Sequence, residues 1–211
     1  MVTKHFTVIP LLTVALSILT ISLSYFSLST QIFAINYSAG TYGSCTFNTC
    51  SISLTSNGAI SVNVTPVANS PTCSVANDSV TATTDSSTGY TVTMTDSDTS
   101  NLMTGPATST VSASLGTPAS PAVLTTNAWG YRVDSTDGFG AGPTTITTNG
   151  TIPILTFAAI PLSSGTPSLI RTTSTADSSS VSTPVWYGLC ADSSLTSGSY
   201  TDSVTYTALI N

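Results

Sequence analysis

The sequence of 211 residues has very little charge, because Asp, Glu, Lys and Arg together make up only 6% of it. All nine acidic residues are Asp, and Glu does not occur. Surface helices usually rely on Glu, Lys and Arg for helix propensity and solubility, so this composition argues against a helical protein. Thr and Val, which favour strands, are abundant instead. Disorder is the alternative for a Ser/Thr-rich chain, but regularly spaced Tyr, Trp, Val and Ile argue against it.

The single Lys and the single His both lie in the first five residues and precede an uncharged, mostly apolar run over residues 6–28. This pattern predicts a secretory signal peptide over residues 1–34, with cleavage after Ala34. The apolar run is longer than an ordinary signal core, so an uncleaved membrane anchor through residues 6–28 is the alternative. Both interpretations place the remaining chain outside the membrane, at an extracellular or cell-surface location.

Residues 35–211 therefore contain no Lys, no His and no Glu, and their two Arg and nine Asp give a formal charge of −7. A surface of this sign does not attract a phosphate backbone, so we expect no nucleic-acid partner. A Ser-His-Asp hydrolase needs an imidazole, and lysine-based nucleophiles need an amine. We accordingly expect a protein that is not an enzyme, with no catalytic residues and no cofactor.

Two pairs of aspartates were the remaining candidates for chemistry: Asp96 with Asp98, and Asp134 with Asp137. Paired carboxylates can hydrolyse glycosides, but Ser/Gly-rich surroundings favour ordinary turn residues. The same four side chains are weak candidates for calcium ligands, because alternating oxygen donors suit Ca²⁺ although no Glu closes the loop. The Gly-rich loop over residues 138–142 lacks the Lys of a phosphate-binding loop and is expected to be a flexible turn.

The stretch from Val185 to Ile210 predicts two antiparallel strands joined by a turn, because apolar and hydroxyl side chains alternate in its second half. Similar patterns predict a hairpin around Ser56–Gly58 and another across Asp85–Gly89. Single strands are expected over residues 109–115 and 127–134, and Pro-interrupted or edge strands over 151–162 and 168–184. The fold class is all-β: an antiparallel β-sandwich, immunoglobulin-like or pilin-like, with about eight to ten short strands.

Four cysteines in an exported chain are most simply two disulfides, for which three pairings exist. We favour Cys45–Cys50, which closes a small loop, with Cys73–Cys190 tying early strands to the end of the chain. A four-cysteine zinc site is the alternative, but the spacing lacks a CxxC knuckle, and no metal is expected.

Four aromatic residues have two interpretations. They either fill the space between two sheets or form an exposed platform that binds carbohydrate, and the first is more usual in β-sandwiches. The residues are Trp129, Tyr131, Trp186 and Tyr187.

The ending YGLCADSSLTSGSYTDSVTYTALIN resembles the closing strands of small bacterial surface β-sandwich proteins, including spore-coat-U-like fimbrial subunits and WxL-like wall proteins. The runs TGYTVTMTD and WGYRVD are similar to recurring segments of the same proteins. Tyr206 stands where the WxL-like pattern has Trp, and no Trp-x-Leu tripeptide occurs. Spore-coat-U-like subunits polymerise when an N-terminal arm fills a neighbour's open groove, and the resemblance gives that role to Ile35, Tyr37 and Ala39.

We therefore expect three parts: residues 1–34 as leader or anchor, 35–44 as an extended arm, and 45–211 as one β-sandwich domain. The expected function is that of a non-catalytic structural or adhesive surface protein, pilin-like, that assembles by edge-strand or donor-strand pairing. Its partners would be itself, other surface proteins, or cell-wall or host glycans, with membrane contact only through residues 6–28. The alternative is a carbohydrate-binding module that uses exposed Trp or Tyr. The candidate assembly residues are Ile35, Tyr37, Ala39, Val204, Tyr206 and Ala208.

Overall fold

The computed structural model describes residues 50–68, 70–142, 144–152 and 154–211. In these residues the only helix is the 3-10 turn η1 (Pro106–Thr108), so the predicted all-β class is confirmed. The strands are β1 (Ile52–Thr55), β2 (Thr72–Thr84), β3 (Tyr90–Asp96), β4 (Met103–Thr104), β5 (Thr110–Ala113), β6 (Ala122–Val123), β7 (Ala128–Arg132), β8 (Thr147–Gly150), β9 (Thr156–Phe157), β10 (Ser168–Thr172), β11 (Ser182–Ala191) and β12 (Val204–Ile210).

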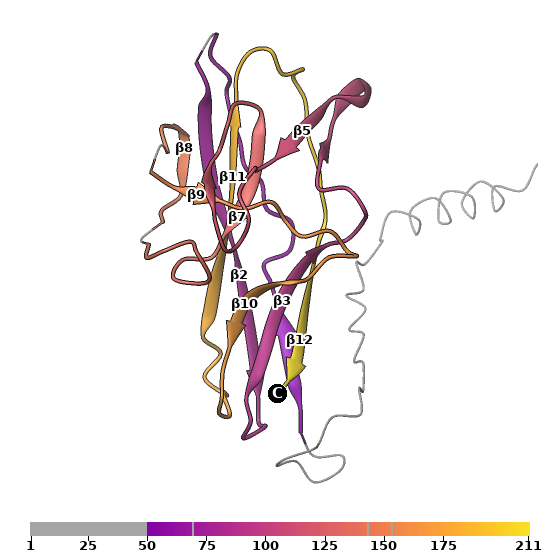
Figure 1. Ribbon diagram of the computed structural model, residues 1–211, viewed down its shortest axis with the longest axis vertical. Helices are drawn as coiled ribbons and strands as arrows, with labels where there is room; N and C mark the ends of the chain where they lie inside the picture. Colours follow the sequence, from indigo (N-terminus) through magenta and orange to yellow (C-terminus); the bar gives the residue numbers. More distant parts are fainter. Residues whose placement is uncertain (1–49, 69, 143, 153) are drawn as a thin grey trace, which may run out of the picture. The chain divides into compact units, whose positions relative to one another are not determined.

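These strands form two main sheets (Figure 1). The first sheet has the order β1-β2-β11-β7-β5-β4, with β8 also paired to β2, and the second has the order β10-β3-β12. A small pair, β6-β9, is separate. The expectation of purely antiparallel sheets is wrong, because β5 and β7 are parallel. The described residues hold more than the predicted eight to ten strands because three strands, β4, β6 and β9, have only two residues each.

The predicted closing hairpin does not form, because its two strands belong to different sheets. β11 pairs with β2 over its whole length, and β7 occupies its other side from Trp186 to Cys190, the end that a closing hairpin would use for β12. β12 pairs instead with β3. The chain between Asp192 and Ser203 therefore connects the first sheet to the second. Alternation identified the inward row of β3, and that of β12 from Val204 to Ala208, but it carries no information on which strand lies alongside.

The hairpin predicted across Asp85–Gly89 is wrong for the same reason, since β2 lies in the first sheet and β3 in the second. Gly89 nevertheless has a structural role in this connection. Its φ is +78°, and a Cβ there would lie 2.3 Å from the carbonyl oxygen of Thr173. A glycine is needed where the chain both turns left-handed and touches another backbone.

The third predicted hairpin, around Ser56–Gly58, is also absent. β1 pairs with the C-terminal end of β2, and residues 59–66 form no strand. Gly58 adopts the left-handed φ of +83°, but Asn57 donates its backbone N–H to the Asp78 carboxylate over 2.8 Å. The chain then continues beside β2, where Ser74 donates its hydroxyl to the Asn63 carbonyl. β2 therefore replaces the local partner that the Asn-Gly pair suggested.

Other predicted elements agree with the structure. β7 forms within residues 127–134, β5 within 109–115, and β10 is an edge strand paired only with β3 in the described chain. The Pro-containing stretch 151–162 contributes only the two-residue β9. Proline lacks the N–H that a ladder requires, which accounts for the interruption.

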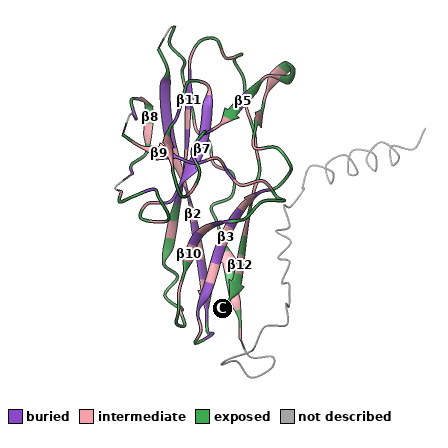
Figure 2. Cartoon of the chain, viewed as in Figure 1, coloured by how far each residue is buried: buried purple, intermediate pink, exposed green. Residues whose placement is uncertain are grey.

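The larger core cluster takes buried side chains from both main sheets. It combines Val80 and Ala82 of β2 with Tyr90, Val92 and Met94 of β3. Half-buried apolar residues of β1 and β12 pack against it. Figure 2 shows that burial alternates along β3, whereas β7 is buried throughout. A second cluster surrounds the pair Cys73 and Cys190.

Candidate functional site

The candidate assembly residues of β12 face the interior. Val204, Tyr206 and Ala208 are half-buried and pack against the larger core cluster. Thr205 and Thr207 alternate with them and are exposed. Because successive side chains of a strand point to opposite faces, the inward row cannot also contact a partner. Any assembly through β12 must use its backbone edge and its outer row.

Tyr206 is also part of a polar contact inside the core. Its hydroxyl lies 2.7 Å from the hydroxyl of Tyr187 on β11, and Tyr187 donates to Met94 Sδ at 3.5 Å. Burial raises the pKa of both tyrosines, and the negative charge of Asp78 on β2 raises it further. For Tyr187, the hydrogen bond from Tyr206 lowers the pKa and partly offsets this increase. Both phenols are therefore neutral at physiological pH, and their contact joins one strand of each sheet.

The two edges of the second sheet differ in their protection. On the β10 edge, Arg171 forms a 3.1 Å ion pair with Asp177, and the register with β3 shifts between Leu169 and Arg171. A charge and a bulge are common devices that prevent a strand from pairing with another chain. β12 has neither a charged residue nor a proline between Val204 and Ile210. β1 lies near β12, but no backbone hydrogen bond joins these two described strands.

An acidic group lies where β12 begins and β3 ends. Asp96 is 1% exposed, and its Oδ2 has no hydrogen-bond partner; Oδ2 of Asp202 is likewise buried and unpaired. Burial raises the pKa of both carboxyls, for Asp202 to about 6, and repulsion from Asp98 adds to each. Across the described residues, no three His, Cys, Asp or Glu side chains are arranged to hold a metal ion. Calcium ligation by Asp96 and Asp98 stays a prediction.

The second predicted pair of aspartates is divided between two roles. Arg132, which is 2% exposed, makes a 2.6 Å ion pair with Asp134, and Thr144 donates both its N–H and its hydroxyl to the same carboxylate. Asp134 therefore compensates a buried guanidinium. Asp137 is exposed and forms no hydrogen bond or ion pair with the described residues. The two do not act as a matched pair.

The candidate aromatic residues lie in the interior. Trp129 and Trp186 are 5% and 8% exposed, and Tyr131 is fully buried; Tyr187 is half-buried. Trp129 donates its indole N–H to the Asn101 carbonyl over 3.0 Å, whereas Nε1 of Trp186 has no partner. Burial raises the pKa of Tyr131 to about 12, against a hydrogen bond to Ser168. A platform for sugar rings needs exposed faces, which these side chains lack.

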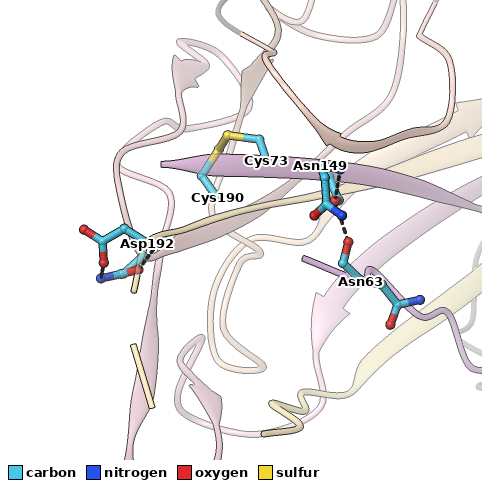
Figure 3. Close-up of a disulfide and its surroundings, with 7 residues drawn as sticks. Asn63, Cys73, Asn149, Cys190 and Asp192 are labelled. Atoms are coloured by element: carbon cyan, nitrogen blue, oxygen red, sulfur yellow. Dashed lines mark hydrogen bonds between the residues drawn. A yellow bond between two sulfur atoms is a disulfide. The ribbon is translucent and has the colours of Figure 1, made fainter. Parts of the chain in front are cut away.

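The predicted disulfide between Cys73 and Cys190 is present. The two residues are directly opposite in the register of β2 and β11, with Cα atoms 4.1 Å apart, so the bridge crosses two neighbouring strands of one sheet. Figure 3 shows the bridge near Asn149, whose backbone N–H donates to Ser74 Oγ. On the other side, Asp192 and Asn127 exchange hydrogen bonds. A disulfide and several hydrogen bonds therefore hold this end of the first sheet together.

Several predictions fall on residues that the structure does not describe. The leader 1–34, the arm residues Ile35, Tyr37 and Ala39, and Cys45 of the favoured Cys45–Cys50 bridge all lie outside the described residues. Within the described chain, no helix has the length and apolarity needed to span a membrane.

Two inward-facing aspartates were not among the predicted site residues, although their positions relative to the strands indicate buried carboxyls. Asp202 lies two residues before Val204, so it continues the inward row of β12, and Asp78 precedes Val80 in the same way on β2. Because residues two positions apart in a strand lie on the same face, both side chains share a face with their apolar neighbours. The structure confirms this for Asp78, which is 2% exposed. An Asp in phase with an apolar row is a recognisable sign of a buried carboxyl.

Comparison with known proteins adds no family to this description: no family model, no curated protein and no solved structure matches the chain.

Proposed function

We propose that the chain is a non-catalytic structural or adhesive protein of the cell surface, folded as a β-sandwich and assembled through the free edge of β12. Its relation to spore-coat-U-like subunits belongs to the same proposal. The observation that carries it is the difference between the two edges of the second sheet. An unprotected edge offers unpaired N–H and C=O groups to another strand.

The sandwich is supported by the shared core. Side chains from β2 and β11 of the first sheet and from β3 and β10 of the second lie in one cluster of buried residues. The contact between Tyr187 and Tyr206 joins the sheets at their inner faces. Two sheets that bury one common set of side chains are expected to pack face to face.

Export is supported by the Cys73–Cys190 bridge, because disulfides persist mainly in oxidising compartments. The N-terminal leader predicted from the sequence agrees with this location. A strand that pairs with β12 would extend the second sheet from one molecule into the next.

The seven residues of β12 provide the backbone for such pairing. Leu209 and Ile210 are 47% and 38% exposed and give the end of the edge an apolar surface. Ile35, Tyr37 and Ala39 form the donor strand in this proposal, because their alternating apolar side chains suit a groove beside an edge. Main-chain hydrogen bonds supply affinity in this mode, and the side chains supply register.

The test compares residues 35–211 with two edge variants by light scattering and electron microscopy. Thr207→Lys puts a charge on the β12 edge and should convert polymers to monomers, since an edge lysine prevents pairing. Thr172→Lys is the matched control: it is an exposed threonine on the β10 edge, which already carries Arg171. Circular dichroism should show both variants folded.

Deletion of residues 35–44 addresses the donor strand separately. It should abolish polymers while leaving a folded monomer. If polymers persist after this deletion but not in Thr207→Lys, the arm is not the donor strand, and assembly through the β12 edge is still supported. A wild-type protein that is monomeric at every concentration would contradict the whole proposal.

A further inference from the structure

A cavity of about 570 Å³ lies beside β10, away from the β12 edge. Its wall comes from residues 116–119, from Asp137, and from the segments 159–162 and 166–169. Ile160 is 1% exposed and belongs to the larger core cluster, so the floor of the cavity is rigidly packed. A volume of this size is typical of sites for small molecules or single side chains.

Three polar side chains in this wall have no partner within the described chain: the amide of Asn101, the carboxylate of Asp137 and the hydroxyl of Thr166. The backbone of Asn101 is engaged, since its carbonyl accepts from Trp129. Ligand sites characteristically combine an apolar lining with a few unpaired polar groups that fix orientation.

The loop that carries Asp137 is held in one conformation. Phe139 is 4% exposed and packs edge-on against Tyr131, with ring centroids 5.4 Å apart. Gly138 donates its N–H to the Pro118 carbonyl over 2.9 Å. Asp137 itself has a φ of +50°, a left-handed conformation that Asp adopts more readily than most residues. The backbone that carries this exposed carboxylate is therefore held at the cavity wall.

Charge restricts what this cavity can accept. Asp137 is the only charged side chain among the described residues that line it. The two arginines of the described chain, Arg132 and Arg171, are each bound to an aspartate elsewhere, so neither is available for an anionic ligand. No aromatic ring lines the cavity either, which removes the usual stacking surface for a sugar.

We propose that this cavity binds a primary aliphatic ammonium group. The ammonium donates to the Asp137 carboxylate, with the amide oxygen of Asn101 and the hydroxyl of Thr166 as further acceptors. The aliphatic portion lies on the apolar surface around Ile160 and Leu162. An ammonium has three donors and no acceptor, which matches a site that presents only one charge, a negative one.

No lysine side chain of residues 35–211 supplies the amine, because that range contains no lysine. The sources considered are a free alkylamine or polyamine and a lysine side chain of a different protein, and both present the same chemical group. This site is independent of the assembly proposed for β12.

The experiment titrates the full chain, in the form that its host exports, with four probes of similar length. They are cadaverine, N-acetyl-lysine methylamide, pentanol as the neutral analogue and hexanoate as the anionic one. The signal is intrinsic fluorescence, because Trp129 is hydrogen-bonded to a residue of the wall. Saturable binding of the amines alone, weakened by added salt, is the expected result.

Two variants test the role of the carboxylate. Asp137→Asn removes the charge while keeping a residue that tolerates positive φ, and it should weaken amine binding about tenfold, which corresponds to about 1.4 kcal/mol. Asp85→Asn is the control, because it removes one charge from an exposed aspartate outside the cavity and should leave affinity unchanged.

Each outcome decides the proposal. Tighter binding of the lysine derivative assigns the site to a partner protein, and tighter binding of cadaverine assigns it to a free polyamine. Equal affinity for pentanol, equal affinity of Asp137→Asn and wild type, or no saturable amine binding at all would overturn it.

Discussion

β11 and β12 follow one another in the chain and have similar strand-forming composition, yet their positions differ. β11 lies between β2 and β7, and Val185 and Trp186 at its centre are buried on opposite faces. Among the described strands, β12 pairs only with β3, and none of its residues is fully buried. The comparison shows that a strand's surroundings, rather than its own alternation, decide whether it stabilises the fold or remains available to a partner.

The largest difference should appear when the covalent link of β11 is removed. Replacing both Cys73 and Cys190 by Ser should lower the free energy of unfolding by roughly 4 kcal/mol, because the bridge closes a long loop in the unfolded chain. Urea unfolding with and without a reducing agent measures the loss. The reductant should cause a loss of similar size in wild type and a much smaller one in the variant, where only the bridge of Cys50 remains to be reduced. Unchanged stability would show that β11 is held by packing alone.

A matched pair of truncations sharpens the same comparison. Val185→Ala on β11 should cost about 2 to 3 kcal/mol, since a side chain with no exposed surface leaves a cavity. Val204→Ala on β12 should cost about 1 kcal/mol, because a half-buried site loses less and can be filled by water. Urea unfolding of both variants measures the difference. Equal costs would contradict the assignment of β12 as the less enclosed strand.

The smallest effect concerns pH at the start of β12. The pKa of Asp202 is raised in the folded protein to about 6 from 3.8, so the folded state holds the proton more tightly than the unfolded state. Its contribution to stability is therefore present below about pH 4 and is lost as pH rises to about 6. Thermal unfolding across this range should show Tm falling by on the order of 2 °C.

Asp202→Asn separates this contribution from the other aspartates. The amide cannot ionise, so the variant should lose the part of the pH dependence that lies between about pH 4 and 6. Asp192→Asn is the control, because hydrogen bonds from Ser194 hold the pKa of Asp192 below its usual value. A Tm profile of Asp202→Asn that is identical to wild type would show that this carboxyl does not titrate there.

The sequence predicted the inward faces of strands and one disulfide, but it did not predict which strands pair with one another. The inward rows of β3 and β12 follow from alternation, and the Cys73–Cys190 bridge is the one favoured among three pairings because Cys45 and Cys50 lie close together in the sequence. The closing hairpin failed because pairing depends on which strand has a free edge, and β11 is paired on both sides from Trp186 to Cys190. Each connection with hairpin-like turn residues instead leads to another sheet or continues beside β2.

For the candidate sites too, burial could be predicted from the sequence, whereas contacts between distant segments could not. Burial of Trp129 and Trp186 was the more usual expectation for large aromatics in a β-sandwich. The cavity beside β10 could not be predicted, because its wall combines Asn101, residues 116–119, Asp137 and residues from 159 to 169, which come together only in the fold. The unpaired state of Asp137 is also a property of the assembled fold: the neighbouring Asp134 is engaged by Arg132, and nothing in the local sequence distinguishes the two.

The position of the disulfide also determines how the molecule would respond to a pulling force. Cys73 and Cys190 are separated by 117 positions, and tension applied at the two ends would pass through the bridge instead of through that segment. About 400 Å of extended chain is thereby protected from stretching. Only the residues before Cys73 and after Cys190, including all of β12, can be drawn out. While the bridge is oxidised, extension of the protein is limited to these two end segments.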